Sequence, residues 1–289
     1  GTTHPNHYGE IGDCEFTVKV DPLDVIDESW EYNNETDTTL YVALYPNQSG
    51  WPKKLIVAEN GYPPLVSQPE IANIDLSANA EIIFASNDSI YVFTYNGGTC
   101  FGWPKCFKGV YGLVVGDLNC IGSPEIIAVS AESVKVFTSQ GNVLTGWPKQ
   151  IPGTDTLRLY GYPAIGYIEG TDKRQVVVYA SHKDGEAHKS RVLVYDYDGD
   201  LLYNFAASDF STGSGNGAAI SDVNADGNDE IIVSYEYHRK NGAVTIDSGF
   251  TEIFNKNGHV RTLEWGSAWQ TSALVDLDSP GDGYPEMIT

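Results

Sequence analysis

The stretch Ala219-Ile-Ser-Asp222-Val-Asn-Ala-Asp-Gly-Asn-Asp-Glu230-Ile-Ile-Val233 contains the pattern from which the fold can be worked out. A short apolar run ends in Asp222, a polar loop carries Gly227, and Glu230 opens a second apolar run. Short aliphatic runs of this length, bounded by Asp, Asn and Gly, are typical of β-strands. The stretch therefore predicts two strands joined by a tight polar loop.

The same order of residues recurs along the chain, although the loops differ. The copies run from Asp75 to Glu81, from Asp117 to Glu125 and from Asp276 to Glu286, and a worn copy runs from Tyr167 to Gln175. The markers Glu81, Glu125, Gln175, Glu230 and Glu286 lie 44, 50, 55 and 56 residues apart. Repeats of roughly 40 to 60 residues indicate a propeller or a similar array.

Each repeat continues with a third apolar run, a turn and a fourth segment. The third runs are Ser89–Phe93, Ser133–Phe137, Arg191–Tyr195 and Phe250–Phe254, and each is followed by a Gly-containing turn. The fourth segment opens three times with the same tetrapeptide, at Gly50–Lys53, Gly102–Lys105 and Gly146–Lys149. Because Pro removes a ladder donor, this segment suits the outermost strand, and we interpret its Trp as a packing residue. The chain is predicted to be an all-β propeller of four-stranded blades.

The ends of the chain leave the number of blades open. The last repeat ends after its second strand, while residues 39–44 and 50–53 resemble a third and a fourth strand. Either this N-terminal half closes a ring of about five blades against residues 270–289, or the chain is part of a larger ring. We expect residues 39–289 to form the propeller and residues 1–38 to form a separate N-terminal β extension.

The charge balance restricts the partners of the protein. Asp and Glu number 39 against 17 Lys and Arg, and the formal net charge is −22. Such a surface repels nucleic acid and attracts cations. No apolar run approaches the roughly 20 residues of a membrane helix. We therefore expect metal ions as partners, with no nucleic-acid partner and no transmembrane segment.

The loop from Asp222 to Glu230 has the spacing of a calcium site. Ca²⁺ prefers six to eight oxygen ligands, supplied by alternate residues around a Gly. Asp222, Asn224, Asp226 and Glu230 would bind through their side chains, and Asn228 through its backbone carbonyl. The alternative is a solvated turn without metal. Calcium is the predicted cofactor.

The other four loops depart from this spacing. A second site is expected at Asp276, Asp278, Asp282 and Glu286, in a loop with two extra residues. Ile121 replaces the third carboxylate in one loop, the loop from Asp75 is two residues short, and Lys173 and Arg174 would repel a cation in another. We expect these three turns to be held by hydrogen bonds alone.

Residues 57–289 resemble FG-GAP (VCBS-type) repeats, which form the propellers of integrin α-subunits, through the loop pattern and the recurring Gly-Trp-Pro-Lys. Residues 1–38 are similar to the end of an Ig-like CARDB adhesion module through Phe16–Pro22, Val25–Glu28 and Glu31–Thr36. These resemblances imply an extracellular, calcium-binding, adhesive module of a larger cell-surface protein.

Two further features bear on the compartment of the protein. Cys100 and Cys106 bracket five residues and are expected to form a disulfide, although free thiols are the alternative, and the pairing of Cys14 and Cys120 stays open. The sequons at Asn34, Asn47 and Asn87 permit glycosylation. Both features favour an extracellular or cell-surface location.

No catalytic motif stands out in the sequence. The six histidines are scattered, and no nucleophile elbow, phosphate loop or zinc-protease motif occurs. We expect a non-catalytic structural or adhesive module, whose partners include glycans, surface proteins or copies of itself. The alternatives are a glycan- or protein-recognition module accessory to a secreted enzyme, and a calcium-dependent polysaccharide lyase.

Overall fold

The computed structural model describes residues 12–19, 35–42, 50–51, 53, 67–86, 88–153, 157–170, 172–182, 190–207, 215–241, 244–265, 273–275 and 286–288. Every regular element in these ranges is a β-strand, so the predicted all-β class is confirmed. None of them is a helix that could span a bilayer. The chain divides into two compact units, residues 1–52 and residues 53–289, and the predicted boundary after residue 38 stays a prediction.

The first unit contains an antiparallel pair, β1 (Gly12–Lys19) and β2 (Glu35–Val42). Their register runs without a break from Gly12 opposite Val42 to Lys19 opposite Glu35. We expected residues 39–44 to form a third propeller strand, but residues 39–42 belong to β2 and pair with β1. The physical reason is that β1 is a full-length partner nearby in the sequence, and closing a short loop costs less entropy than closing a long one.

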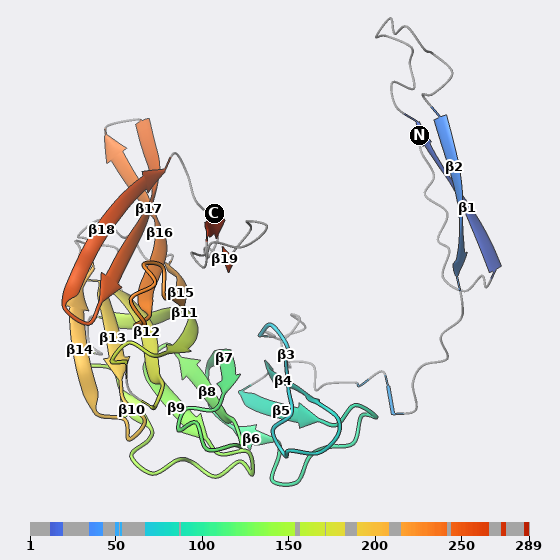
Figure 1. Ribbon diagram of the computed structural model, residues 1–289, viewed down its shortest axis with the longest axis horizontal. Helices are drawn as coiled ribbons and strands as arrows, with labels where there is room; N and C mark the ends of the chain where they lie inside the picture. The colour runs from blue at the N-terminus through green and yellow to red at the C-terminus, as the bar shows by residue number, and fades with distance from the viewer. Residues whose placement is uncertain are drawn as a thin grey trace, which may run out of the picture. The chain divides into compact units, whose positions relative to one another are not determined.

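The second unit contains four antiparallel meanders of four strands, here called blades 1 to 4 (Figure 1). Blade 1 consists of β3 (Glu70–Ala72), β4 (Glu81–Ser86), β5 (Ser89–Phe93) and β6 (Lys105–Cys106). Blade 2 consists of β7 (Val110–Gly116), β8 (Glu125–Ser130), β9 (Ser133–Phe137) and β10 (Lys149–Gln150). Blade 3 consists of β11 (Leu157–Gly166), β12 (Gln175–His182), β13 (Arg191–Tyr195) and β14 (Leu201–Ala206). Blade 4 consists of β15 (Gly215–Ser221), β16 (Glu230–Asn241), β17 (Val244–Asn255) and β18 (Gly258–Trp265).

A fifth repeat contributes the antiparallel pair β19 (Ala273–Val275) and β20 (Glu286–Ile288). The strand order within each repeat is the predicted one. Four complete blades are therefore present in the described ranges, and a ring of five four-stranded blades stays a prediction.

Neighbouring blades pack through both faces of their sheets. On β8, Ile126 and Ala128 lie in a buried cluster with side chains of blade 1, while Ile127 and Val129 lie in a second cluster with side chains of blade 3. A third cluster joins blade 3 to blade 4 and contains Tyr179 and Phe254. Because both faces of a strand such as β8 are covered, its sequence is a continuous apolar run.

The first strands of successive blades lie against one another, as in a propeller. Strand β7 contacts β3 and β11, and β15 contacts β11 and β19. A single parallel bridge between Tyr162 and Gly217 joins β11 to β15. The Tyr162 hydroxyl also accepts a hydrogen bond of 3.2 Å from the backbone of Gln68, which precedes β3. The second unit is therefore propeller-like, with the first strands innermost.

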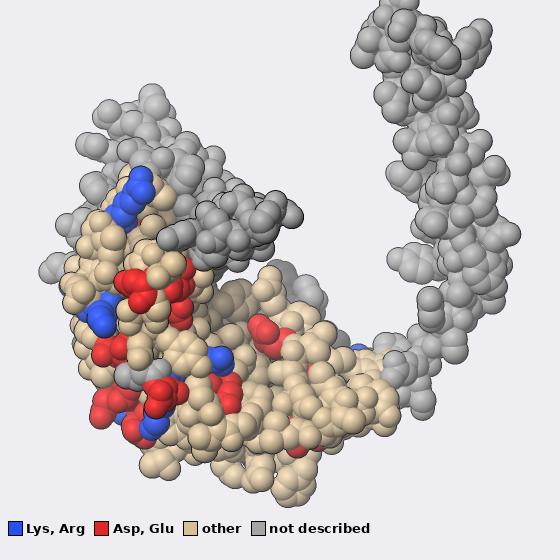
Figure 2. Space-filling view, in the orientation of Figure 1, with Lys and Arg blue, Asp and Glu red and all other residues tan. Residues whose placement is uncertain are grey.

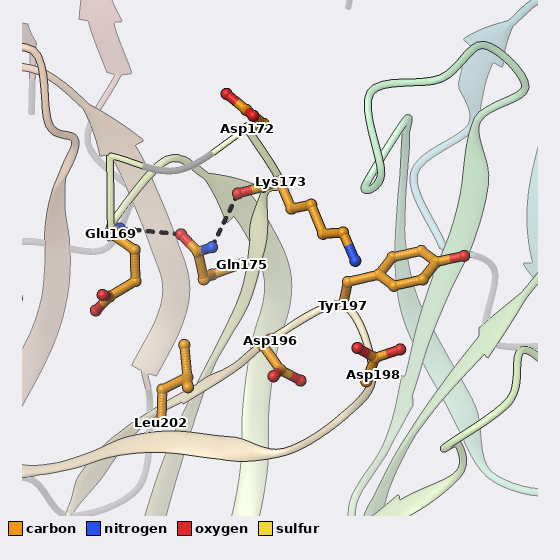
Figure 3. Close-up of a pocket in the computed structure, with 8 residues that line it drawn as sticks. All are labelled: Glu169, Asp172, Lys173, Gln175, Asp196, Tyr197, Asp198 and Leu202. Carbon is orange, nitrogen blue, oxygen red and sulfur yellow. Dashed lines mark hydrogen bonds between the residues drawn. The ribbon is translucent and has the colours of Figure 1, made fainter.

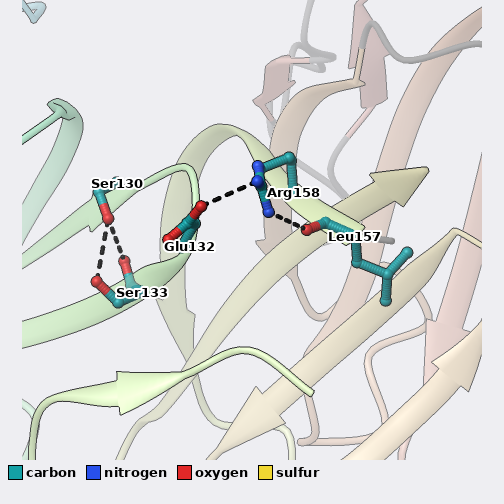
Figure 4. Close-up of polar contacts among 5 residues, drawn as sticks. All are labelled: Ser130, Glu132, Ser133, Leu157 and Arg158. Carbon is teal, nitrogen blue, oxygen red and sulfur yellow. Dashed lines mark hydrogen bonds and ion pairs between the residues drawn. The ribbon is translucent and has the colours of Figure 1, made fainter. Parts of the chain in front are cut away.

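A polar joint connects blade 2 to the start of blade 3 (Figure 4). Arg158 forms an ion pair of 2.9 Å with Glu132 and donates a hydrogen bond to the Leu157 carbonyl. Beside it, the Leu159 amide donates to the Ala131 carbonyl at 2.8 Å. Since Glu132 is largely exposed, the ion pair contributes at most about 1 kcal/mol.

The Gly-Trp-Pro-Lys segments that lead into β6 of blade 1 and β10 of blade 2 each bind the next blade. Trp103 and Trp147 are each 7% exposed, which confirms their packing role, and each precedes a cis proline. The Trp103 indole donates a 3.0 Å hydrogen bond to the Ser139 carbonyl, and the Trp147 indole donates one of 3.0 Å to the Tyr197 carbonyl. We call each segment, together with the turn that it contacts, a clasp.

Candidate metal-binding loop

The loop from Asp222 to Glu230 joins β15 to β16 and wraps its backbone around side-chain oxygens. The Asp222 carboxylate accepts hydrogen bonds from the amides of Asp226 (3.1 Å) and Gly227 (2.8 Å). The Asn224 side-chain oxygen accepts from the same Asp226 amide at 2.8 Å. Ala225 and Gly227 adopt positive φ angles of 55° and 89°. As a result, one oxygen of Asp222 and one of Asn224 converge on a single N–H group.

Asp226 is exposed and lies in the middle of this loop. One oxygen of its carboxylate accepts hydrogen bonds from both the side chain and the backbone of Asn228, each 2.9 Å long. These bonds lower the pKa of the Asp226 carboxyl, with the side-chain bond as the largest cause. The group therefore carries a negative charge beside Asp222.

Glu230 is buried at the end of the loop, with both carboxylate oxygens bonded to protein. One accepts from the Val223 amide at 3.1 Å, and the other accepts from the Asn224 side-chain amide at 2.9 Å. Burial raises the pKa of Glu230, and the carboxylates of Asp226, Asp222 and Asp229 raise it further. Glu230 stays a predicted ligand, and its bond from the Asn224 side chain also orients Asn224.

The same Glu bond recurs in the other repeats. Glu81 accepts from the Ile74 amide at 3.0 Å, Glu125 accepts from the Leu118 amide at 2.9 Å, and Gln175 accepts from the Glu169 amide at 3.1 Å. Sequence reasoning missed this role. The available signal was that Glu or Gln persists in loops that lack the other metal ligands.

The loop from Asp117 to Glu125 in blade 2 makes the same turn without a third carboxylate. Its Asp117 accepts from the amides of Ile121 (3.3 Å) and Gly122 (2.8 Å), and Asn119 accepts from Ile121 at 3.0 Å. Ile121 stands where Asp226 stands in blade 4, and it is 85% exposed. The turn itself therefore does not require a carboxylate at the position of Asp226.

The donor set of the blade 4 loop fits a hard cation such as Ca²⁺. Asp222 and Asp226 offer carboxylate oxygens and Asn224 offers an amide oxygen, and the Asp229 carboxylate follows in the same loop. In the described ranges, no three His, Cys, Asp or Glu side chains gather closely enough to hold a metal by themselves. Beside Asp222 and Asp226, Asn224 offers its side-chain oxygen as a third donor in this loop.

The loop is fastened to blade 3 next to the worn repeat. The Tyr167 amide donates a 2.6 Å hydrogen bond to the Asp229 carboxylate, and the Asp229 amide donates one of 3.1 Å to the Tyr167 carbonyl. The Tyr167 hydroxyl lies 3.1 Å from Cys120 of blade 2. Tyr167, which stands where the other repeats have their opening Asp, therefore contacts the loops of both blade 2 and blade 4.

The cationic residues of the worn repeat also contact neighbouring groups. The Arg174 backbone amide donates to the Leu118 carbonyl at 2.9 Å, and its guanidinium donates to the Asp117 carbonyl at 3.4 Å. The Lys173 ammonium lies 4.7 Å from the centre of the Tyr197 ring. Arg174 thus places positive charge beside the blade 2 loop, where the third carboxylate is missing.

An acidic cavity of about 450 Å³ opens beside Lys173 (Figure 3). Its lining residues are Glu169, Asp172, Lys173, Gln175, Asp196, Tyr197, Asp198 and Leu202. The Gln175 side chain bridges the Glu169 amide and the Lys173 carbonyl. A hydrogen bond to Glu169 raises the pKa of the Tyr203 hydroxyl to about 12. On the face shown in Figure 2, acidic side chains gather mainly over the strands of blades 3 and 4.

The expected disulfide between Cys100 and Cys106 is absent, and these residues and Cys120 are free thiols. The Cys100 amide donates to the Val92 carbonyl at 3.0 Å, whereas Cys106 pairs with Ser89. Val92 and Ser89 are separated by three residue steps of roughly 3.3 Å on β5. The two cysteines are thus held about 10 Å apart along the strand, beyond the roughly 7 Å that a disulfide allows.

Several predicted residues lie outside what the structure describes. They are the ligands Asp276, Asp278 and Asp282, and the sequons at Asn34, Asn47 and Asn87. Glu286 begins β20, and Cys14 lies on β1 opposite Leu40, but their side chains are outside the described set.

No protein-family model and no curated protein matches the sequence. Among solved structures, the chain is similar to BBS1N in the crystal structure of its complex with ARL6DN, soaked with lead. The identity is 8%, the TM-score is 0.43, and the match covers 76% of this chain and 74% of that chain. It is also similar to the Vibrio cholerae biofilm matrix protein Bap1, with 13% identity, a TM-score of 0.36, and coverage of 81% and 43% of the two chains.

Proposed function

We propose that this protein is a non-catalytic, calcium-stabilised β-propeller module of the FG-GAP type that acts as a structural or adhesive part of a larger extracellular or cell-surface protein. The observation that carries the proposal is the pair Asp226 and Ile121. Both residues occupy the same position of the same turn, and Ile121 closes that turn as well as Asp226 does. A carboxylate that the turn does not need is explained by a bound cation.

In this proposal, Asp222, Asn224 and Asp226 hold the calcium ion with their side-chain oxygens, and the Asn228 carbonyl completes the loop. Glu230 keeps Asn224 oriented from behind. The ion supplies positive charge that offsets repulsion among Asp222, Asp226 and Asp229. Because Asp229 is bonded to Tyr167, a loop held by calcium also keeps blade 4 against blade 3.

The test is calcium titration by calorimetry together with thermal melting in calcium and in EDTA. A site that binds only the folded state adds about 2.7 kcal/mol at a hundredfold excess of calcium over Kd. We expect EDTA to lower the Tm of the unmodified protein and calcium to restore it. The informative variant is Asp226→Ile, which installs the blade 2 residue and should abolish both effects while the protein still folds in EDTA.

Two results would contradict the proposal. One is a Tm of the unmodified protein that does not respond to calcium or EDTA. The other is an Asp226→Ile protein that binds calcium as tightly as the unmodified protein. A second variant, Asp222→Ala, then shows independently whether that calcium is bound at this loop.

A further inference from the structure

A second cavity, of about 350 Å³, lies where blade 1 meets blade 2. Blade 1 lines it with Ile74, Asp75, Thr94, Thr99, Cys100 and Phe101, and blade 2 lines it with Ser123, Ser139 and Gln140. The volume is at the lower end of the range of roughly 300 to 1,000 Å³ that is usual for small-molecule sites. In contrast to the acidic cavity of blade 3, it has one carboxylate among several hydroxyl and amide groups.

The most unusual residue of this cavity is Phe101. It is 92% exposed and directly precedes the first clasp segment, Gly102–Lys105. In the other copies of this segment, the same position holds Ser49 and Thr145. The clasp therefore forms without an aromatic residue at this point. An exposed ring that the fold does not need is suited to contact with a ligand.

The polar groups of the cavity are also open to a ligand. Within the described part of the chain, the side chains of Thr99, Ser123 and Gln140 make no hydrogen bond. One oxygen of Asp75 accepts from the Ser77 amide at 2.8 Å, and its other oxygen accepts no bond there. Hydroxyl, amide and carboxylate groups are the donors and acceptors that fix the hydroxyls of a sugar.

We infer that this cleft binds a neutral saccharide, with a pyranose ring on the face of Phe101 and its hydroxyls bonded to Asp75, Thr99, Ser123 and Gln140. The face of an aromatic ring is electron-rich and apolar, and it accepts the C–H side of a pyranose. The Asp75 carboxylate and the net charge of −22 disfavour uronic acids and sulfated sugars. The cleft shares no residue with the calcium loop, so this inference stands apart from the calcium proposal.

Exposed aliphatic residues lie close to the same loops. Leu76 and Ile121 are exposed, and a Cβ on Gly122 would lie 3.9 Å from the Leu76 side chain. An apolar surface alone would suit a protein partner. The unengaged hydroxyls and the amide favour a saccharide, because burying them under an apolar partner would leave them without bonds.

The test uses the full chain and saturation-transfer NMR against hexasaccharides of glucose, mannose, xylose and N-acetylglucosamine, with hexagalacturonate as the acidic comparison. The informative variant is Phe101→Thr, which carries the residue found at the same place in blade 2 and should keep the Tm. Thr145→Phe is the matched control outside the cleft. Ser123→Ala and Gln140→Ala test whether these two polar side chains on the blade 2 side of the cleft contribute to sugar binding.

We expect saturation transfer to at least one neutral hexasaccharide and none to hexagalacturonate. Phe101→Thr should weaken the affinity at least tenfold, the two polar variants should weaken it less, and Thr145→Phe should leave it unchanged. Binding should persist in Asp226→Ile, which separates this site from the calcium loop. Absence of binding by every neutral sugar, binding of the uronate only, or unchanged affinity in Phe101→Thr would overturn the inference.

Discussion

At the start of the second strand of blades 1 to 4, one buried side-chain oxygen holds the loop that precedes that strand. Glu81, Glu125, Glu230 and Gln175 all accept a hydrogen bond from a backbone amide six or seven residues earlier. Gln175 shows that the bond needs an acceptor and not a charge. A buried amide without a partner costs about 1–3 kcal/mol, so this single oxygen is significant for each repeat.

Glu81 offers a direct test of this role. Glu81→Gln keeps an acceptor for the Ile74 amide and should unfold with a free energy close to that of the unmodified protein. Glu81→Leu removes the acceptor and should lose about 1–3 kcal/mol in urea unfolding. The explanation would be wrong if the two variants were equally stable.

At the scale of a structural element, the clasps hold consecutive blades together. Each has a glycine with a positive φ angle whose missing side chain lets two backbones meet. A Cβ on Gly102 would lie 2.2 Å from the Gln140 carbonyl oxygen, and one on Gly146 would lie 1.9 Å from the Asp198 carbonyl oxygen. Lys105 and Lys149 pack in turn on Gly141 and Gly199. In both copies, the Gly and the Lys of the tetrapeptide pack on the Gly-containing turn of the next blade. The recurrence of this packing explains the recurrence of the tetrapeptide.

Gly146→Ala tests the clasp, and Gly258→Ala is its control. Both glycines have positive φ angles, but nothing lies within 4 Å of a Cβ on Gly258. Gly258→Ala should cost only the strain of about 1–2 kcal/mol. Gly146→Ala should lower the free energy of unfolding by about 1–3 kcal/mol more, because the added Cβ would also displace the backbone at Asp198. Equal losses in chemical unfolding would show that the close approach contributes nothing.

At the scale of the whole second unit, Tyr162 connects the inner strands of the propeller-like array. Its hydroxyl accepts from Gln68 before β3, and its backbone pairs with Gly217 on β15. A Cβ on Gly112 of β7 would lie 3.1 Å from its ring. One residue of blade 3 therefore lies beside residues of blades 2 and 4 and of the segment that leads into blade 1.

Tyr162→Phe should lose only the bond to Gln68, which is worth about 1 kcal/mol. Tyr162→Ala removes the ring as well and should cost about 2–3 kcal/mol, less than a fully buried aromatic residue. Calorimetry should also show a broader transition for Tyr162→Ala, since the blades then unfold less cooperatively. A sharp transition at an unchanged Tm would exclude this role.

Much of the fold could be predicted because each repeat carries its own local signals. Aliphatic runs such as Ile231-Ile-Val233 and the glycines of the turns specify strands and hairpins without reference to the rest of the chain. The loop between β15 and β16 was located in the same way, from the spacing of Asp222, Asn224 and Asp226, and its binding of calcium stays a proposal. The expected disulfide between Cys100 and Cys106 is absent, because closeness in sequence says nothing about where β5 holds each residue.

By itself, the sequence determined the all-β class, the order of strands within each repeat and the position of the candidate metal loop, since all three depend on contacts between residues close in the chain. Only the tertiary structure decided that the Trp103 and Trp147 indoles bind the next blade and that Cys100 and Cys106 are held apart. The physical reason is that these outcomes depend on which carbonyl, amide or strand edge lies within hydrogen-bond distance after folding. That distance is set by packing between sheets, which residue spacing does not encode.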